Sequence, residues 1–205
     1  VAPYALPTIL QPVAGPGGFI NRNSAVMAIN GAALIMLAGA YDNAYGSISA
    51  RGPANSQVFM NDGVDITHGS IETMDEGVIT ITARMASPAT FRNLEITGDG
   101  RGVEVDQNAA FALAGTIWNR HKITLSADGT AQPSRLVAQG AVTLTGGAGL
   151  VQMLDEKQSM VVGDGSRNRL TIELGQVLQG AGQLGIDTLA ITNRGNILAN
   201  VQEKK

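Results

Sequence analysis

The sequence has no cysteine and few aromatic residues, and both absences limit how the chain can be stabilised. Without cysteine there is no disulfide and no thiolate zinc site. Aromatic residues make up 4% of the chain, so small and aliphatic side chains must fill the interior. Charged residues reach only 15%, against about 25% in an average soluble protein. This composition suits a narrow stacked sheet better than a broad globular core.

The chain also lacks a strong charge of one sign and a long apolar run. Its net charge of −3 gives no reason to expect a nucleic acid or an anionic membrane as partner. The most apolar segment, residues 25–41, is 17 residues long (41 − 25 + 1), and a membrane-spanning helix needs about 20. Gly31 and Gly39 divide this segment into pieces of strand length. We therefore expect buried strands here and no membrane span.

Glycine and aliphatic residues are what the sequence has in abundance. There are 26 glycines in 205 residues, near twice the usual share of about 7%. Valine, isoleucine, leucine and threonine accompany them, as short strands with frequent turns require. Over residues 140–200, short aliphatic runs alternate with glycines. This pattern predicts a stack of short strands joined by tight turns, which is a β-solenoid.

A repeat of about 23 residues supports this architecture further upstream. Its copies begin at Gly46, Gly69 and Gly115, whose spacings are 23 (69 − 46) and 46 (115 − 69), or twice 23. The missing copy falls on residues 92–94, which keep the aliphatic third position and lose the glycine. The pattern predicts one inward column of aliphatic residues, each preceded by an outward residue that bears a hydroxyl in most copies. The column consists of Ile48, Ile71, Leu94 and Ile117, and the hydroxyl residues are Ser24, Ser47, Ser70 and Thr116.

Three segments follow from these patterns. Residues 1–22 are rich in proline and glycine and are expected to form an extended arm or linker. Residues 23–200 are expected to form the β-solenoid, with roughly eight turns and a length on the order of 40 Å. Residues 201–205 form a polar tail. The open ends of such a stack and the arm favour self-association or contact with neighbouring structural proteins.

The C-terminal passages resemble a known kind of repeat. They are residues 140–147 (GAVTLTGG), 170–172 (LTI), 179–185 (QGAGQLG) and 189–200 (LAITNRGNILAN). These passages resemble the β-solenoid regions of bacterial autotransporter and filamentous-haemagglutinin-type surface proteins. Phage tail spikes and fibres contain segments with a similar sequence pattern. The resemblance is best over residues 115–200. It implies an all-β fold, a right-handed parallel β-helix. It also implies that the protein is secreted or is displayed on a cell surface or a virion, and that it acts as a stalk or an adhesive surface.

Two glycine motifs point to ligands but lack the context that binding needs. Residues 180–185 (GAGQLG) match the spaced glycines of a dinucleotide site, which requires a helix to follow and to hold the pyrophosphate. The residues that follow, 186–192, have strand composition instead. Residues 146–149 (GGAG) are similar to calcium-binding nonapeptide repeats but lack the aspartate ligand. We expect no cofactor and no bound metal.

A carboxylate group offers the enzymatic alternative. It comprises Glu95, Asp99, Glu104 and Asp106, with Arg101 among them. Glu104 and Asp106 point to one side of a strand, and Glu95 is expected beside them on the next turn. Such a group could act in a polysaccharide lyase or glycoside hydrolase. Outward carboxylates also keep a sheet soluble, so the pattern leaves both interpretations open.

Trp118, the only tryptophan, lies close to Arg120 and His121. An outward ring beside cationic donors predicts a glycan-binding patch of Trp118, Arg120 and His121, although Trp118 could instead fill a corner of the solenoid. We assign no catalytic residue. The sequence thus favours a non-enzymatic structural or adhesive module of a cell-surface, fibre or virion assembly, with a surface glycan as ligand. The alternative is a polysaccharide-degrading β-helix.

Overall fold

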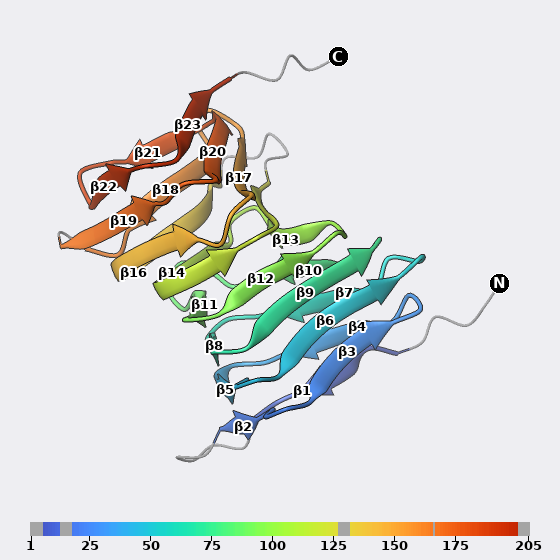
Figure 1. Cartoon of the computed structure of the whole chain (residues 1–205). Helices are drawn as coiled ribbons and strands as arrows, with labels where there is room; N and C mark the ends of the chain where they lie inside the picture. The colour runs from blue at the N-terminus through green and yellow to red at the C-terminus, as the bar shows by residue number, and fades with distance from the viewer. Residues whose placement is uncertain (1–5, 13–17, 127–131, 166, 201–205) are drawn as a thin grey trace.

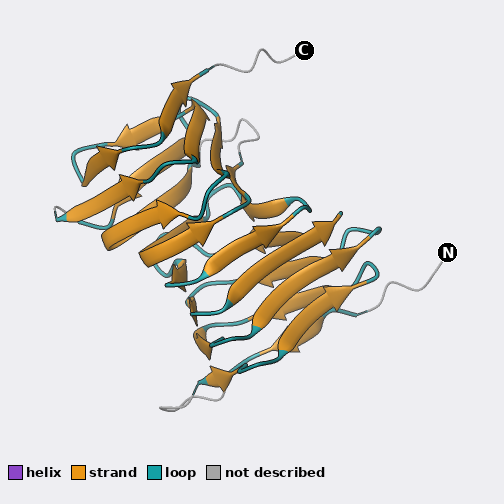
Figure 2. Ribbon diagram, in the orientation of Figure 1, coloured by secondary structure: helices purple, strands orange, loops and turns teal. Residues whose placement is uncertain are grey.

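The computed structural model describes residues 6–12, 18–126, 132–165 and 167–200, and within them every regular element is a β-strand (Figure 2). The strands pair in parallel and stack along one axis from the N-terminal to the C-terminal end (Figure 1). The fold predicted from the sequence is confirmed as an all-β solenoid, with about seven turns where roughly eight were expected.

Each turn of the solenoid passes through three parallel ladders, here called face one, face two and face three. Face one is the nine-stranded sheet of the described residues, in the order β1 (Thr8–Leu10), β4 (Ala33–Met36), β7 (Gln57–Met60), β10 (Val78–Ile81), β13 (Gly102–Val105), β15 (Lys122–Leu125), β17 (Gly149–Leu154), β20 (Gln176–Ala181) and β23 (Asn196–Ala199). Face two contains β2 (Phe19–Ile20), β5 (Gly39–Asp42), β8 (Val64–Thr67), β11 (Ala89–Arg92), the first parts of β14 (Ala110–Asn119) and β16 (Ser134–Thr145), β18 (Ser159–Gly163) and β21 (Gln183–Gly185). Face three contains β3 (Ala25–Ile29), β6 (Ser47–Gly52), β9 (Ser70–Asp75), β12 (Glu95–Gly98), the second parts of β14 and β16, β19 (Asn168–Ile172) and β22 (Leu189–Asn193).

The core is a set of columns in which each inward residue sits over its counterpart in the preceding turn. Alternate residues of a strand point to opposite sides, so each strand of face one places two residues in the interior. One of these columns is continuous through seven strands and consists of Leu34, Val58, Ile79, Val103, Ile123, Val151 and Leu178. All seven side chains are buried. Aliphatic side chains fill this interior almost alone, as the shortage of aromatic residues predicts.

The column predicted from the 23-residue repeat is correct about the inward side but wrong about the neighbours. Ile48 pairs with Ile71 as expected, and Ile71 then pairs with Ile96 rather than with Leu94. The turn from Ile71 to Ile96 has 25 residues (96 − 71), two more than the repeat. A shift of two residues keeps every side chain on its own side of the strand, so Leu94 remains buried.

The outward hydroxyl row is partly as predicted. Ser47 pairs with Ser70, whereas the partner of Ser47 in the preceding turn is Ala25 rather than Ser24. Beyond Ser70 the row continues through Glu95 and Trp118. The outer surface of face three therefore changes from small polar residues to a carboxylate and an aromatic ring.

Strands β14 and β16 run through the corner between faces two and three without a break. The register of β14 against β16 shifts between Ala114 and Gly115, which marks the bend. On the outer side of face two, these strands and β18 bury a second, smaller apolar cluster of Ala110, Ala112, Val137 and Val162.

The solenoid begins within the segment that was expected to be an arm. Residues 8–10 form β1 and pair with β4, and residues 19–20 form β2 and pair with β5. Pro7 precedes β1 and Pro12 follows it closely, which suits a strand paired on one side because proline has no N–H to donate. Residues 1–5, 13–17 and 201–205 of the expected arm and tail lie outside the described residues.

The apolar segment 25–41 forms β3, β4 and most of β5, so it consists of strands of the solenoid. Among the described residues, no helix has the length and apolar character needed to cross a membrane.

Candidate functional site

The corner between faces two and three is built from buried asparagines and glycines. Asn21 donates from Nδ2 to Oδ1 of Asn43 at 2.6 Å, and both side chains are buried. Nδ2 of Asn43 in turn donates to the carbonyl oxygen of Ser70, in the next turn of the solenoid, at 3.2 Å. A Cβ at Gly46 would lie 2.2 Å from the Asn21 carbonyl oxygen, and one at Gly69 would lie 2.0 Å from that of Asn43. The glycines of the repeat are therefore required because the asparagines below them occupy the space.

Each of these corners ends in a residue with left-handed backbone geometry, two positions before the first outward residue of face three. Asn23 has φ 53°, Tyr45 has 61°, His68 has 66° and Asn93 has 48°. Asparagine and histidine are both enriched in this region, whereas a tyrosine there is unusual. Tyr45 is thus the residue that this backbone geometry favours least among the four corners.

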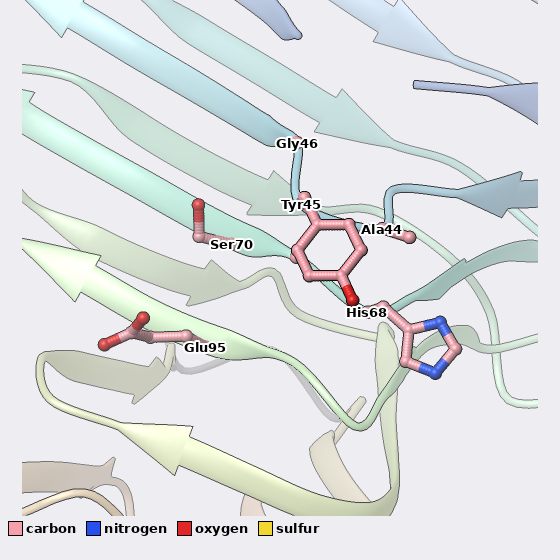
Figure 3. Close-up of a pocket in the computed structure, with 7 residues that line it drawn as sticks. Ala44, Tyr45, Gly46, His68, Ser70 and Glu95 are labelled. Atoms are coloured by element: carbon pink, nitrogen blue, oxygen red, sulfur yellow. The ribbon is translucent and has the colours of Figure 1, made fainter. Parts of the chain in front are cut away.

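Tyr45 and His68 lie at the rim of a shallow pocket of about 500 Å³ on this corner (Figure 3). The Tyr45 side chain is 87% exposed, and its phenol oxygen is directed to the side of His68. Ser70 and Glu95 extend outward from the adjoining strands β9 and β12. The lining residues are Ala44, Tyr45, Gly46, His68, Gly69, Ser70 and Glu95.

A second hollow of about 440 Å³ lies against the other side of Tyr45. Its lining shares Tyr45, Gly46 and Ser70 with the first pocket and adds Asn23, Ser24, Ala25 and Ser47. The Tyr45 ring therefore stands between two open hollows on one edge of face three. The polar side-chain groups that line them are hydroxyl groups, the His68 imidazole, the Asn23 amide and the Glu95 carboxylate.

Trp118 continues the row of this surface. Its backbone pairs with Glu95 in the ladder of face three, and its side chain is 41% exposed. Trp118 therefore does not fill a corner of the interior. Arg120 lies two residues later on the same side of the chain, and its Nε is 3.1 Å from Oε1 of Glu95. The ion pair is largely exposed and so contributes little stability.

The structure places His121 apart from this pair. Its Nε2 lies 2.9 Å from the carbonyl oxygen of Gly100, at the corner that leads to face one. Burial lowers the pKa of His121, although the contact with the Gly100 carbonyl opposes this. A neutral ring that donates Nε2–H to Gly100 satisfies this geometry. Of the predicted glycan-binding residues, Trp118 and Arg120 are therefore neighbours on the surface, and His121 is engaged by the backbone.

The carboxylates of the enzymatic alternative do not form one group. Glu95 lies on face three, whereas Glu104 belongs to β13 on face one and Asp106 follows that strand. Glu104 is paired with Arg101, at 2.9 Å between Oε2 and the guanidinium. Burial raises the pKa of Asp106, and the nearby charge of Glu104 adds to this effect.

The remaining motifs lie in the scaffold. No group of acidic and histidine side chains within the described part of the chain could hold a metal ion. The motif of residues 180–185 runs from β20 into β21 and is followed by β22, so no helix begins there. The glycines of residues 146–149 lie in the turn between β16 and β17.

Sequence reasoning missed Tyr45 and His68 as site residues. A signal was present, because both occupy the place that asparagine takes in the flanking corners, Asn23 and Asn93. That signal can be seen only once the strands are in register, since the corners differ in length.

Comparison of the chain with protein-family models, with curated proteins and with solved structures gave no significant match. The β-solenoid is shown by its own strand pairing. The resemblance to autotransporter, haemagglutinin or tail-spike proteins rests on the sequence pattern alone.

Proposed function

We propose that this chain is a non-enzymatic β-solenoid module of a cell-surface, fibre or virion assembly, where it has a structural role and adheres to glycans through face three. The observation that supports adhesion most directly is the exposed Trp118 ring beside the Glu95–Arg120 ion pair. A sugar presents an apolar face and a rim of hydroxyl groups. An exposed indole offers the matching apolar surface, and the adjacent carboxylate and guanidinium offer hydrogen bonds.

The scaffold suits this role because it holds the site rigid. Trp118 and Glu95 are both on paired strands of face three, and their sequence neighbours Ile117 and Ile96 are buried in the core. A preorganised surface does not have to be ordered when the ligand binds, which favours affinity. The open shape of the neighbouring hollows suits a ligand that lies along the surface.

The separation of the carboxylates favours adhesion over degradation. An acid–base pair for glycoside cleavage flanks one bond, with its carboxyl groups about 5–10 Å apart. Glu95 and the Glu104–Asp106 pair are instead on different faces. The enzymatic alternative would therefore depend on Glu104 and Asp106 alone.

The assembly itself is inferred from the resemblance of the repeats. A surface or virion protein of this kind is secreted or displayed, and its partners would be further copies of the chain or neighbouring structural proteins. Low charge and strands paired along their whole length suit such a stalk.

Binding to an array of neutral and acidic glycans tests the proposal. We expect the chain to retain at least one glycan, and Trp118→Ala to lose it without a change in melting temperature. Ile9→Ala is the control for an exposed apolar side chain, because Ile9 is 61% exposed and lies on face one, in the first strand of the solenoid. Equal binding by Trp118→Ala would refute the assignment. Release of shortened sugars, abolished by Glu104→Gln and Asp106→Asn, would support a lyase or hydrolase instead.

A further inference from the structure

We infer that Tyr45 and His68 form a second recognition site, and that it binds a neutral oligosaccharide lying along the solenoid axis between Tyr45 and Trp118. This inference rests on the proposed adhesion to glycans and names the class of glycan and the remaining contacts. The two residues were not among those that the sequence pattern singled out for binding.

The first argument is that neither side chain serves the fold. Both have positive φ, 61° for Tyr45 and 66° for His68, and both are exposed. Backbone strain of this kind is concentrated at functional sites, and it is greatest at Tyr45, because histidine is enriched in this region together with asparagine and aspartate. The chain itself uses asparagine at the equivalent positions of the flanking corners, Asn23 and Asn93.

The second argument is that position 68 departs from the row of buried amides in the turns below it. By the register of face two, Asn21, Asn43 and His68 occupy equivalent places in successive turns. Asn21 and Asn43 are buried and hydrogen-bonded to each other. His68 is exposed instead. Its imidazole therefore extends to the surface at a place where the two preceding turns bury an asparagine.

The third argument concerns the chemistry of the ligand. Tyr45 lines both hollows, and Ser47, Ser70 and His68 supply hydrogen-bonding groups. Glu95 is the only carboxylate among the residues that line these hollows, and its charge is balanced by Arg120. The lining residues include no lysine or arginine. The hollows therefore offer hydrogen bonds to a neutral sugar but no unpaired lysine or arginine to hold an acidic one.

The fourth argument is that the site has the length of a chain of sugars. Tyr45 lies two residues before the start of β6, and three strand spacings separate β6 from β14, which carries Trp118. At about 4.8 Å for each spacing, the two rings are about 14 Å apart along the axis. His68, Ser70 and Glu95 lie on the turns between them. A linear oligosaccharide can therefore contact both rings at once.

Isothermal titration calorimetry with hexasaccharides tests the inference. The neutral probes are cellohexaose, maltohexaose and chitohexaose, and hexagalacturonate is the acidic probe. We expect at least one neutral probe to bind and hexagalacturonate to bind more weakly. Tyr45→Asn and His68→Asn should each reduce affinity about tenfold or more, which is typical of a central contact.

The same variants separate binding from folding. Because asparagine relieves the backbone strain, the melting temperature should stay the same or rise by about 2–4 °C. Ile9→Asn, on face one, is the control for an exposed apolar side chain and should leave binding unchanged. A clear fall in melting temperature in Tyr45→Asn would show a structural role and overturn the inference.

The outcomes also distinguish this inference from the proposed function. Loss of binding in Trp118→Ala with full binding in Tyr45→Asn and His68→Asn overturns the second site and leaves adhesion through Trp118 in place. Preference for hexagalacturonate overturns the assignment of a neutral ligand. If none of the four probes binds, the inference fails, and the wider glycan array still decides the proposed function.

Discussion

Gln176 holds together three turns of the solenoid at the corner between faces three and one, and its replacement by leucine should be costly. Its Nε2 donates to the carbonyl oxygens of Asn119 at 2.8 Å and Gly147 at 2.8 Å, with Thr145 further away at 3.1 Å. Its Oε1 accepts from Nδ2 of Asn119 at 3.2 Å. Gln176 is 1% exposed and Asn119 is fully buried, so water does not replace these contacts.

The amide can reach Asn119 only because the residue between them is a glycine. A Cβ at Gly149 would lie 2.2 Å from the Asn119 carbonyl oxygen and 2.4 Å from Oε1 of Gln176. Two N–H donors and one accepted hydrogen bond, at about 1 kcal/mol each, give a loss of about 3 kcal/mol in Gln176→Leu. Because whole domains are stable by only about 5–15 kcal/mol, this loss should be easy to measure.

Urea unfolding followed by tryptophan fluorescence is the appropriate assay, since Trp118 is the only tryptophan and directly precedes Asn119. Gln179→Leu makes the same change on the same strand, at a side chain that is only partly buried, and should alter stability by less than about 0.5 kcal/mol. Gly149→Ala should destabilise the same contacts, so the double variant Gly149→Ala/Gln176→Leu should lose less than the sum of the two. An effect of Gln176→Leu no larger than that of Gln179→Leu, or full additivity in the double variant, would refute this reasoning.

Three further predictions follow from the interior. Ile71→Asp should prevent folding, because it places an unpaired charge between Ile48 and Ile96. The control is Thr171→Asp, which changes a partly exposed side chain. If both variants gave the same circular-dichroism strand signal and melting temperature, the assignment of Ile71 to the core would be wrong. Gly69 and Gly140 have nearly the same φ, 69° and 70°, but only a Cβ at Gly69 would meet a backbone atom, at 2.0 Å. In urea unfolding, Gly140→Ala should lower the free energy of unfolding by about 1–2 kcal/mol, and Gly69→Ala should lower it clearly more. Equal losses would mean that Asn43, below Gly69, moves to make room for the new methyl group. Burial raises the pKa of Tyr41 to about 12, whereas the phenol of the unfolded chain has a pKa of about 10. The folded state therefore gains stability from this proton below pH 10 and should lose that stability as the pH rises through 12. In thermal melts, the melting temperature of Tyr41→Phe should fall less over this pH range than that of the unchanged protein.

The sequence was sufficient to predict the class of fold and the side of each strand that faces the interior. Ile48, Ile71, Leu94 and Ile117 are all 1% exposed or less, as their shared pattern predicted. The sequence was not sufficient to predict which of them are neighbours. The alternation of side chains along a strand shows which residues face the interior, but it does not show which residue of the next strand pairs with each of them. Register depends on the length of each corner, and the corners of this chain differ by one residue or more.

The same limitation explains the outcome for the site. Glu95 and Glu104 were expected on neighbouring turns of one surface, but a corner lies between them and sends them to different faces. Trp118 and Arg120 are neighbours because they belong to one stretch of chain, and local spacing is enough to expect that. Tyr45 and His68 belong to different turns, so no local spacing could relate them.

The corner between faces two and three shows how this fold can separate folding from binding. Within the sheets, each outward side chain is limited by the neighbours above and below it, and the inward side is committed to the core. At a corner the backbone needs only a residue that tolerates positive φ, and Asn23 and Asn93 satisfy this at little cost. Tyr45 meets the same requirement at a greater cost, and both Tyr45 and His68 expose their rings there. Neither ring is part of the apolar core, so packing does not offset the cost at Tyr45, and the proposed contact with an oligosaccharide would do so.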